Sequence, residues 1–301
     1  MVNKIKEKNY FSKIRTNRGT VQGLATFITN IHLPNFFKGT IYTGKAKQVC
    51  VPGLNCYSCP GATGACPIGS FQAVVGSAKY KFSYYVTGLL ILFGVAVGRL
   101  ICGFLCPFGL FQDLLHKIPS KKLSTEKLKF LRYIKYIMLI AAVWLLGVFI
   151  TDKIGISAPY FCKYVCPQGI LEGGIPLSIA NTSVRATLGK LFAWKSMILI
   201  ITLILSILMY RPFCKWICPL GAFYSLFNKI SLYQYSVDES LCINCGKCKR
   251  TCKMDVDMSK NQTALECIRC GKCVDVCPTG AISTSLSRCV SCSKNKKVRE
   301  I

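Results

Sequence analysis

Eight cysteines near the C-terminus are closely and regularly spaced. The chain has 20 cysteines in 301 residues and is longer and more apolar than a disulfide scaffold, so most of these thiols are expected to bind metal. Eight form two runs of the pattern CxxCxxCxxxC: Cys242, Cys245, Cys248 and Cys252, then Cys267, Cys270, Cys273 and Cys277. Thiolates in such runs bind [4Fe-4S] clusters, which carry electrons.

The two runs predict two clusters with crossed ligands. Three closely spaced cysteines bind one cluster, and the fourth cysteine of each run reaches the other cluster. Gly246 and Gly271 are expected to let backbone amides approach the inorganic sulfurs. Zinc is disfavoured because its four-cysteine sites pair two separate CxxC units. The first cluster is assigned Cys242, Cys245, Cys248 and Cys277, and the second Cys267, Cys270, Cys273 and Cys252.

A second pattern, CxxxCPxGxF, occurs at residues 102–111 and 214–223, with partial copies at residues 66–72 and 162–171. Residues four apart share one face of a helix, and the proline then stops the helix, so the chain can turn around a cluster. The copies suggest a duplicated two-helix unit. We predict a further [4Fe-4S] cluster, bound by Cys102, Cys106, Cys214 and Cys218. The membrane spans and orientation described below would place it at the cytoplasmic face of the membrane.

Six cysteines are predicted at the opposite, outer face of the membrane, which is more than one cluster needs. They are Cys50, Cys56, Cys59, Cys66, Cys162 and Cys166. By analogy with the first pair of motifs, the predicted ligands of a second membrane cluster are Cys162 and Cys166 with Cys59 and Cys66. A disulfide between the remaining cysteines is the alternative, because the outer face of a membrane is oxidising.

Uncharged apolar stretches place these motifs in a membrane. Residues 82–98, 136–151 and 196–210 are candidate spans, and residues 19–37 are a weaker fourth. The basic residues at the boundaries of the first three stretches are expected to snorkel toward water. They are Lys81, Arg99, Lys135, Lys195 and Arg211. Buried core helices are the alternative for the first three stretches, and a signal peptide for the fourth. Basic residues concentrate at the two ends of the chain, so both termini are expected in the cytoplasm.

The predicted fold is therefore an α-helical, multi-pass protein of the inner (cytoplasmic) membrane. It has about four transmembrane helices and a small C-terminal α+β ferredoxin domain of the bacterial two-[4Fe-4S] type, also cytoplasmic. The membrane domain is expected over residues 1–232, the ferredoxin domain over residues 233–285, and a basic tail with Cys289 and Cys292 over residues 286–301.

The chain has 39 Lys and Arg against 12 Asp and Glu. This excess of positive charge does not indicate that the protein binds nucleic acid. The basic residues are spread between apolar spans and are not gathered into one stripe. His32 and His116 are the only histidines, so a multihaem protein is not expected. The scarcity of acid-base groups favours an electron-transfer component over a stand-alone enzyme.

With its membrane CxxxCP motifs and C-terminal ferredoxin runs, the chain resembles the NapH-type membrane iron-sulfur proteins over most of residues 80–285. The resemblance implies electron transfer between the quinone pool or a cytoplasmic donor and a partner reductase. Two ferredoxin clusters and one or two membrane clusters are the expected cofactors, and the lipid bilayer with a redox subunit or quinone the expected partners. An accessory protein that senses redox or metal state is the alternative.

Overall fold

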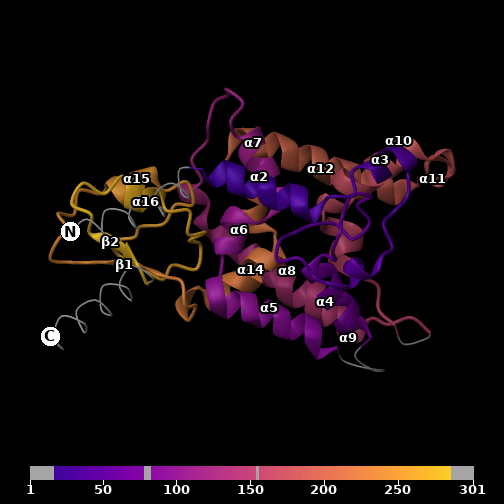
Figure 1. The fold of residues 1–301 in the computed structure, drawn as a ribbon, viewed down its shortest axis with the longest axis horizontal. Coiled ribbons are helices and arrows are strands. Elements are labelled where there is room, and N and C mark those ends of the chain that lie inside the picture. The colour runs from indigo at the N-terminus through magenta and orange to yellow at the C-terminus, as the bar shows by residue number, and fades with distance from the viewer. Residues whose placement is uncertain (1–16, 78–82, 154–155, 286–301) are drawn as a thin grey trace, which may run out of the picture.

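The computed structural model describes residues 17–77, 83–153 and 156–285. A body of helices fills most of the molecule, and a small head lies at one end of it (Figure 1). We call residues 235–284 the head, because they run from strand β1 (Tyr235–Val237) to strand β2 (Ile282–Thr284). At the opposite end of the body lie the short helices α3 (Pro34–Lys38), α10 (Ile175–Ala180) and α11 (Thr182–Ala186) (Figure 1).

Two helical stretches are long and apolar enough to cross a membrane. They are Glu126–Phe149, which contains α8 (Ile134–Met138) and α9 (Leu146–Phe149), and α12 (Lys190–Leu208). In the most apolar 18 residues of each stretch, only 22% is buried in Glu126–Phe149 and only 17% in α12. Large side chains such as Trp144 and Ile200 are more than half exposed. A core helix of a soluble protein would bury these side chains, so their exposure fits lipid.

The other two predicted spans are shorter in the structure, and the expected number of four is not confirmed. Helix α5 (Tyr84–Val97) has 14 residues, or about 21 Å, against an apolar bilayer core of roughly 30 Å. Residues 19–37 do not form one helix: α2 (Arg18–Thr29) ends before a turn, and Pro34 begins α3. Proline favours the first turn of a helix and disrupts its interior.

Each complete CxxxCP motif joins two helices. In the first motif α6 (Leu100–Phe104) is followed by α7 (Pro107–Leu115), and in the second α13 (Pro212–Trp216) is followed by α14 (Pro219–Leu226). The motif proline therefore ends one helix, as predicted, and also begins the next. The partial copy at residues 66–72 likewise starts α4 (Pro67–Gly76) at its proline.

The second cysteine of the motif has the same backbone geometry in three copies. The amide of Cys106 donates to the carbonyl of Ile101, that of Cys166 to Phe161, and that of Cys218 to Phe213. In all of these copies the cysteine has an extended backbone and directly precedes the proline. The copies are thus repeats in structure as well as in sequence.

The head is a small α+β unit. Strands β1 and β2 pair antiparallel, with Ser236 opposite Ser283. The helices α15 (Lys247–Thr251) and α16 (Lys272–Asp275) follow Gly246 and Gly271, whose φ angles are 66° and 81°. A side chain would strain the backbone at these angles, so the two glycines are required by the turn that leads into each helix.

Candidate iron-sulfur centres

The four cysteines assigned to the first ferredoxin cluster surround one small pocket in the head: Cys242, Cys245, Cys248 and Cys277. The structure thus brings together three thiols of the first run and the last thiol of the second. Cys245 is exposed, and Ile243 beside it is 64% exposed. This centre is therefore the one nearest to solvent.

The four cysteines assigned to the second ferredoxin cluster are also neighbours. Burial, followed by the charges of Cys267, Cys270 and Cys252, raises the pKa of Cys273. A thiol in such surroundings loses its proton readily only when it binds a metal, because metal ligation stabilises the thiolate that burial disfavours.

The two complete motifs meet in the body of the protein. Burial raises the pKa of Cys218, and the nearby thiolates of Cys214, Cys102 and Cys106 raise it further. All four side chains are at most 7% exposed. We call Cys102, Cys106, Cys214 and Cys218 the head-proximal site.

The glycine of the CPxG segment has a defined role in this site. The amide of Gly221 donates to the sulfur atom of Cys218 at 3.4 Å. A Cβ atom on Gly109 would also stand 3.0 Å from the guanidinium of Arg211. Glycine at this position therefore lets both an amide and a cation approach the thiolates, which suits a negatively charged cluster.

Two buried arginines link the motifs reciprocally. Arg99 donates to the carbonyl of Cys214 at 3.3 Å, and Arg211 donates to the carbonyl of Cys102. Both arginines are 0% exposed, as is Lys135. The expectation that these three side chains snorkel toward water is therefore wrong, because each finds a buried partner inside the protein.

The partner of Arg211 is a carboxylate of the body. Asp113 Oδ2 lies 2.6 Å from Arg211 and 2.6 Å from Arg18 of α2. Burial opposes ionisation of Asp113, but the charges of the two arginines keep its pKa below the ordinary value. The aspartate thus fixes α2 and the second motif relative to α7.

A glutamine places one more donor at the head-proximal site. Gln112 Nε2 lies 3.1 Å from the sulfur of Cys214 and is completely buried. Sequence reasoning did not identify this residue as functional, although it stands six residues after the second cysteine of its motif, as Gln72 does in the partial copy.

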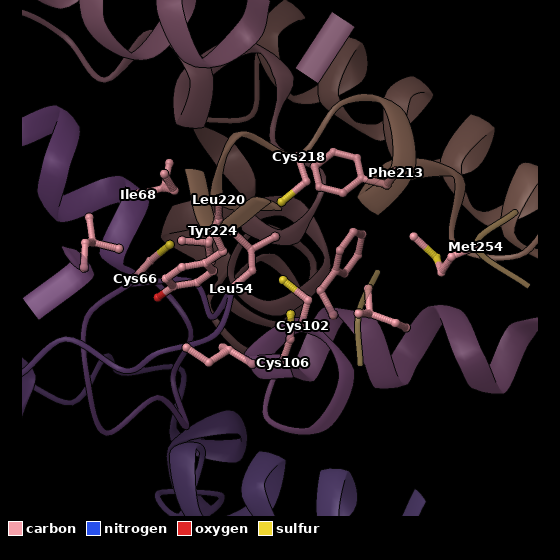
Figure 2. Close-up of a cluster of buried hydrophobic side chains, with 14 of the residues drawn as sticks. Leu54, Cys66, Ile68, Cys102, Cys106, Phe213, Cys218, Leu220, Tyr224 and Met254 are labelled. Atoms are coloured by element: carbon pink, nitrogen blue, oxygen red, sulfur yellow. The ribbon is translucent and has the colours of Figure 1, made fainter. Parts of the chain in front are cut away.

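The second ferredoxin centre faces the head-proximal site. A Cβ atom on Gly103, which lies between Cys102 and Cys106, would stand 2.6 Å from the carbonyl oxygen of Ile268, which lies between Cys267 and Cys270. Figure 2 shows Met254 of the head beside the group that contains Cys102 and Phe213. The backbones that carry the two sets of ligands are therefore in direct contact.

Two ion-pair clamps hold the head in this position. Glu266 pairs with Arg99 at 2.8 Å and with Lys135 at 2.6 Å. Asp255 pairs with Lys215 at 3.0 Å and with Arg132 at 3.2 Å. Although burial alone would raise it, the pKa of Glu266 is held at about 2 by its cationic partners.

The remaining motif copies surround a cavity of about 760 Å³ at the far side of the body, lined by Cys56, Cys66, Cys162 and Cys166 among others. We call these four cysteines the distal site. Cys59, which the sequence analysis selected in place of Cys56, does not line the cavity; its sulfur lies 3.5 Å from Asn30 Oδ1. Every cysteine of the described residues is a free thiol, so none of them forms a disulfide.

The residues present fit [4Fe-4S] clusters. Each of the four sets supplies four thiols, and in the body backbone amides and cations accompany them, which are the groups that stabilise a cluster's charge. Within the part of the chain that the structure describes, no three His, Cys, Asp or Glu side chains stand close enough to hold a single metal ion. Cys289 and Cys292 lie outside the described residues.

Comparison with known families identifies the cofactor. A family described as 4Fe-4S binding domain matches residues 81–126, 135–175 and 192–232, and a second family of the same description matches residues 264–283. The first match covers both complete CxxxCP motifs, and the second covers the last ferredoxin run.

Relatives are found in archaea and bacteria. The chain is 30% identical to the uncharacterized protein MJ0750 of Methanocaldococcus jannaschii over 57% of this chain and 66% of the relative. It is 28% identical to the methylamine utilization ferredoxin-type protein MauN of Paracoccus denitrificans, over 60% of this chain and 54% of the relative. It is 23% identical to the putative electron transport protein YccM of Escherichia coli, over 56% of this chain and 45% of the relative.

The matched region spans about half to two thirds of these relatives. No solved structure matches the chain. The chain thus carries 4Fe-4S binding domains and is homologous to ferredoxin-type electron-transfer proteins such as MauN and YccM.

Proposed function

We propose that the chain is a NapH-type membrane protein that conducts electrons between a solvent-exposed ferredoxin cluster and a [4Fe-4S] cluster in the head-proximal site. The observation that carries this proposal is the contact between Gly103 and Ile268, because it joins the ligand loops of two different centres. Cys242, Cys245, Cys248 and Cys277 would hold the cluster at which electrons enter or leave. Cys267, Cys270, Cys273 and Cys252 would hold the next cluster, and the head-proximal cysteines the last. A bound cluster supplies the one-electron redox chemistry, and the protein holds the clusters in sequence.

The charges around the path support this order. Arg99 bridges the centres, because it donates to Glu266, next to a ligand of the second ferredoxin cluster, and to the carbonyl of Cys214. A fixed cation between two negatively charged clusters stabilises the reduced form of each. The bridge is buried and paired, so it costs no reorganisation when an electron passes.

The surface around the first ferredoxin cluster is suited to a redox partner. Leu241 and Ile243 flank Cys242 and are 50% and 64% exposed. Exposed apolar side chains of this kind support docking of a donor or acceptor protein. The partner is a redox subunit of the cytoplasm, and a quinone or a partner reductase is the other terminus of the path.

The membrane assignment rests on the outward apolar faces of Glu126–Phe149 and α12. The head and both termini are placed in the cytoplasm by the positive-inside rule. The head-proximal site then lies at the cytoplasmic membrane face, as its contact with the head requires.

Electron transfer through the second ferredoxin cluster can be tested directly. The protein is purified without oxygen, placed in liposomes with the head outside, and reduced by a soluble ferredoxin. Freeze-quenched EPR follows the head-proximal cluster. We expect it to be reduced together with the head in the wild type, and much more slowly in Cys270→Ala, which lacks a ligand of the second ferredoxin cluster.

Two results would contradict the proposal. One is a head-proximal cluster that is reduced equally fast in Cys270→Ala, since the ferredoxin clusters would then not be on the path. The other is a wild-type protein in which the head is reduced and the head-proximal cluster stays oxidised on every time scale, as a sensor that passes no electrons permits. The EPR signal of the head-proximal cluster after chemical reduction shows that the variant is folded.

A further inference from the structure

The distal site is built from copies of the same sequence motif as the head-proximal site, except at one ligand. In the head-proximal site two complete motifs supply two cysteines each. In the distal site residues 162–171 supply Cys162 and Cys166, but the copy that contains Cys66 has Ala62 where Cys102 stands in the first motif. One thiol of the expected four is therefore missing from the repeat.

Cys56 takes the place of the missing thiol. It lines the same cavity as Cys66, Cys162 and Cys166, and its sulfur would lie 3.7 Å from a Cβ atom on Gly169. Cys56 is thus directed toward the other three thiols.

The sulfur donors of the two sites correspond. Gln72 Nε2 lies 3.1 Å from the sulfur of Cys162, as Gln112 Nε2 lies 3.1 Å from that of Cys214. The motif glycines also stand close to sulfur in the distal site: a Cβ atom on Gly69 would lie 3.8 Å from the sulfur of Cys162, and one on Gly169 would lie 3.7 Å from that of Cys56. Donors aimed at sulfur are useful only where the sulfur carries negative charge.

The cations also correspond. Lys195 donates to the carbonyl of Cys162 at 3.1 Å, and Lys47 donates to the carbonyl of Ala62 at 2.9 Å. These carbonyls stand at the motif positions that Arg99 and Arg211 contact in the head-proximal site. Both lysines line the distal cavity, so two positive charges face the space between the thiols.

A glutamate holds the substitute ligand in place. Glu172 Oε2 accepts a hydrogen bond from the amide of Cys56 at 2.9 Å, although the two residues are 116 positions apart. At the same motif position in the last copy, Tyr224 donates to the carbonyl of Pro52 at 3.0 Å. Both contacts attach the loop before Cys66 to the second half of the protein.

From this correspondence we infer that the distal site binds a fourth [4Fe-4S] cluster, ligated by Cys56, Cys66, Cys162 and Cys166. The cluster extends the path beyond the head-proximal site. Figure 2 shows Tyr224 and Leu54 between Cys66 and the pair Cys102 and Cys106, and Tyr224 is 0% exposed. The two body centres are thus separated by packed side chains and not by water.

Iron content tests the inference without requiring any electron transfer to a partner. Wild type, Cys56→Ala and Cys59→Ala are purified anaerobically and reconstituted with iron and sulfide. Four clusters give about 16 irons per chain. We expect about 16 for Cys59→Ala, the matched control from the same loop, and about 12 for Cys56→Ala, with the EPR signals of the ferredoxin clusters unchanged.

Either of two results overturns the assignment: an iron content of Cys56→Ala equal to that of the wild type, or an equal loss in Cys59→Ala. If Cys56→Ala fails to fold, Lys195→Met is used, which retains all ligands and removes one cation from the cavity. One of four midpoint potentials should then fall while the others stay fixed, and an unchanged set of potentials overturns the inference. The electron-transfer test with Cys270→Ala is independent of these results, so the two proposals fail separately.

Discussion

Lys135 donates to both carboxylate oxygens of Glu266, at 2.6 and 2.7 Å, and so joins the body to the head beside a ligand of the second ferredoxin cluster. Because Lys135 is 0% exposed, its charge has no access to water when the carboxylate is removed. Breaking a buried ion pair by removing one partner costs about 3–5 kcal/mol. A variant without this carboxylate should therefore hold the head less tightly against the body.

We predict that Glu266→Ala loosens the head without removing a cluster ligand. Hydrogen exchange of residues 264–269 should increase, and the head-proximal cluster should be reduced more slowly by a ferredoxin donor. Glu239→Ala removes an exposed carboxylate of the same head and should change neither quantity. Unchanged exchange in Glu266→Ala would show that the clamp at Asp255 is sufficient to hold the head.

A steric change at the same junction should have a related effect. Gly103→Ala adds a Cβ atom 2.6 Å from the carbonyl of Ile268, a distance that requires the backbones to move apart. We expect slower reduction of the head-proximal cluster, with the iron content unchanged. Gly88→Ala in α5, where a Cβ atom meets nothing within 4 Å, is the matched control. Equal reduction rates in the two variants would rule out the junction as part of the electron path.

The local sites were predictable from sequence because their ligands are close along the chain. The CxxCxxCxxxC runs and the CxxxCP motifs determine which thiols come together, since each run is one loop and each motif one helix end. The buried arginines were not predictable in this way. Arg99 and Arg211 end apolar stretches, where a basic side chain ordinarily snorkels, and their carboxylate partners, Glu266 and Asp113, are about 100 or more residues away.

The change from Cys59 to Cys56 that we propose at the distal site also depends on a contact that the sequence does not show. Cys59 and Cys56 stand in the same irregular loop, and no helical or strand period shows which of them faces the other thiols. The choice is made by a long-range contact, the hydrogen bond from the amide of Cys56 to Glu172. Sequence spacing alone contains no information about that contact.

Removing the partly buried carboxylate of Asp113 should destabilise the head-proximal site. Asp113→Ala leaves Arg211 and Arg18 without their carboxylate, and Arg211 is 0% exposed. We expect a loss of about 3–5 kcal/mol in stability, measured as a lower thermal midpoint in detergent and as faster loss of iron to a chelator. Asp152→Ala, in an exposed loop, should behave as the wild type. Equal chelation rates would contradict the role of Asp113.

Glu172 allows a prediction that separates charge from hydrogen bonding. The amide of Cys56 donates to its carboxylate, and a glutamine in its place still presents an oxygen that can accept this bond. Glu172→Gln should therefore retain the distal cluster, whereas Glu172→Ala frees the loop and should release about four irons per chain to a chelator.

The last prediction concerns the donor at the sulfur of Cys214. Gln112→Met keeps the size of the side chain but removes the N–H group that lies 3.1 Å from that sulfur. A hydrogen bond to a cluster ligand favours the reduced, more negative form. If its strength differs by about 1 kcal/mol between the two states, its loss lowers the midpoint potential by about 40 mV. Potentiometric EPR should show this fall for the head-proximal cluster alone.

Gln72→Met should instead lower the potential of the distal cluster, because Gln72 donates to Cys162. Since each glutamine contacts only its own site, a shift of the same cluster in both variants would contradict the assignment of two separate centres in the body.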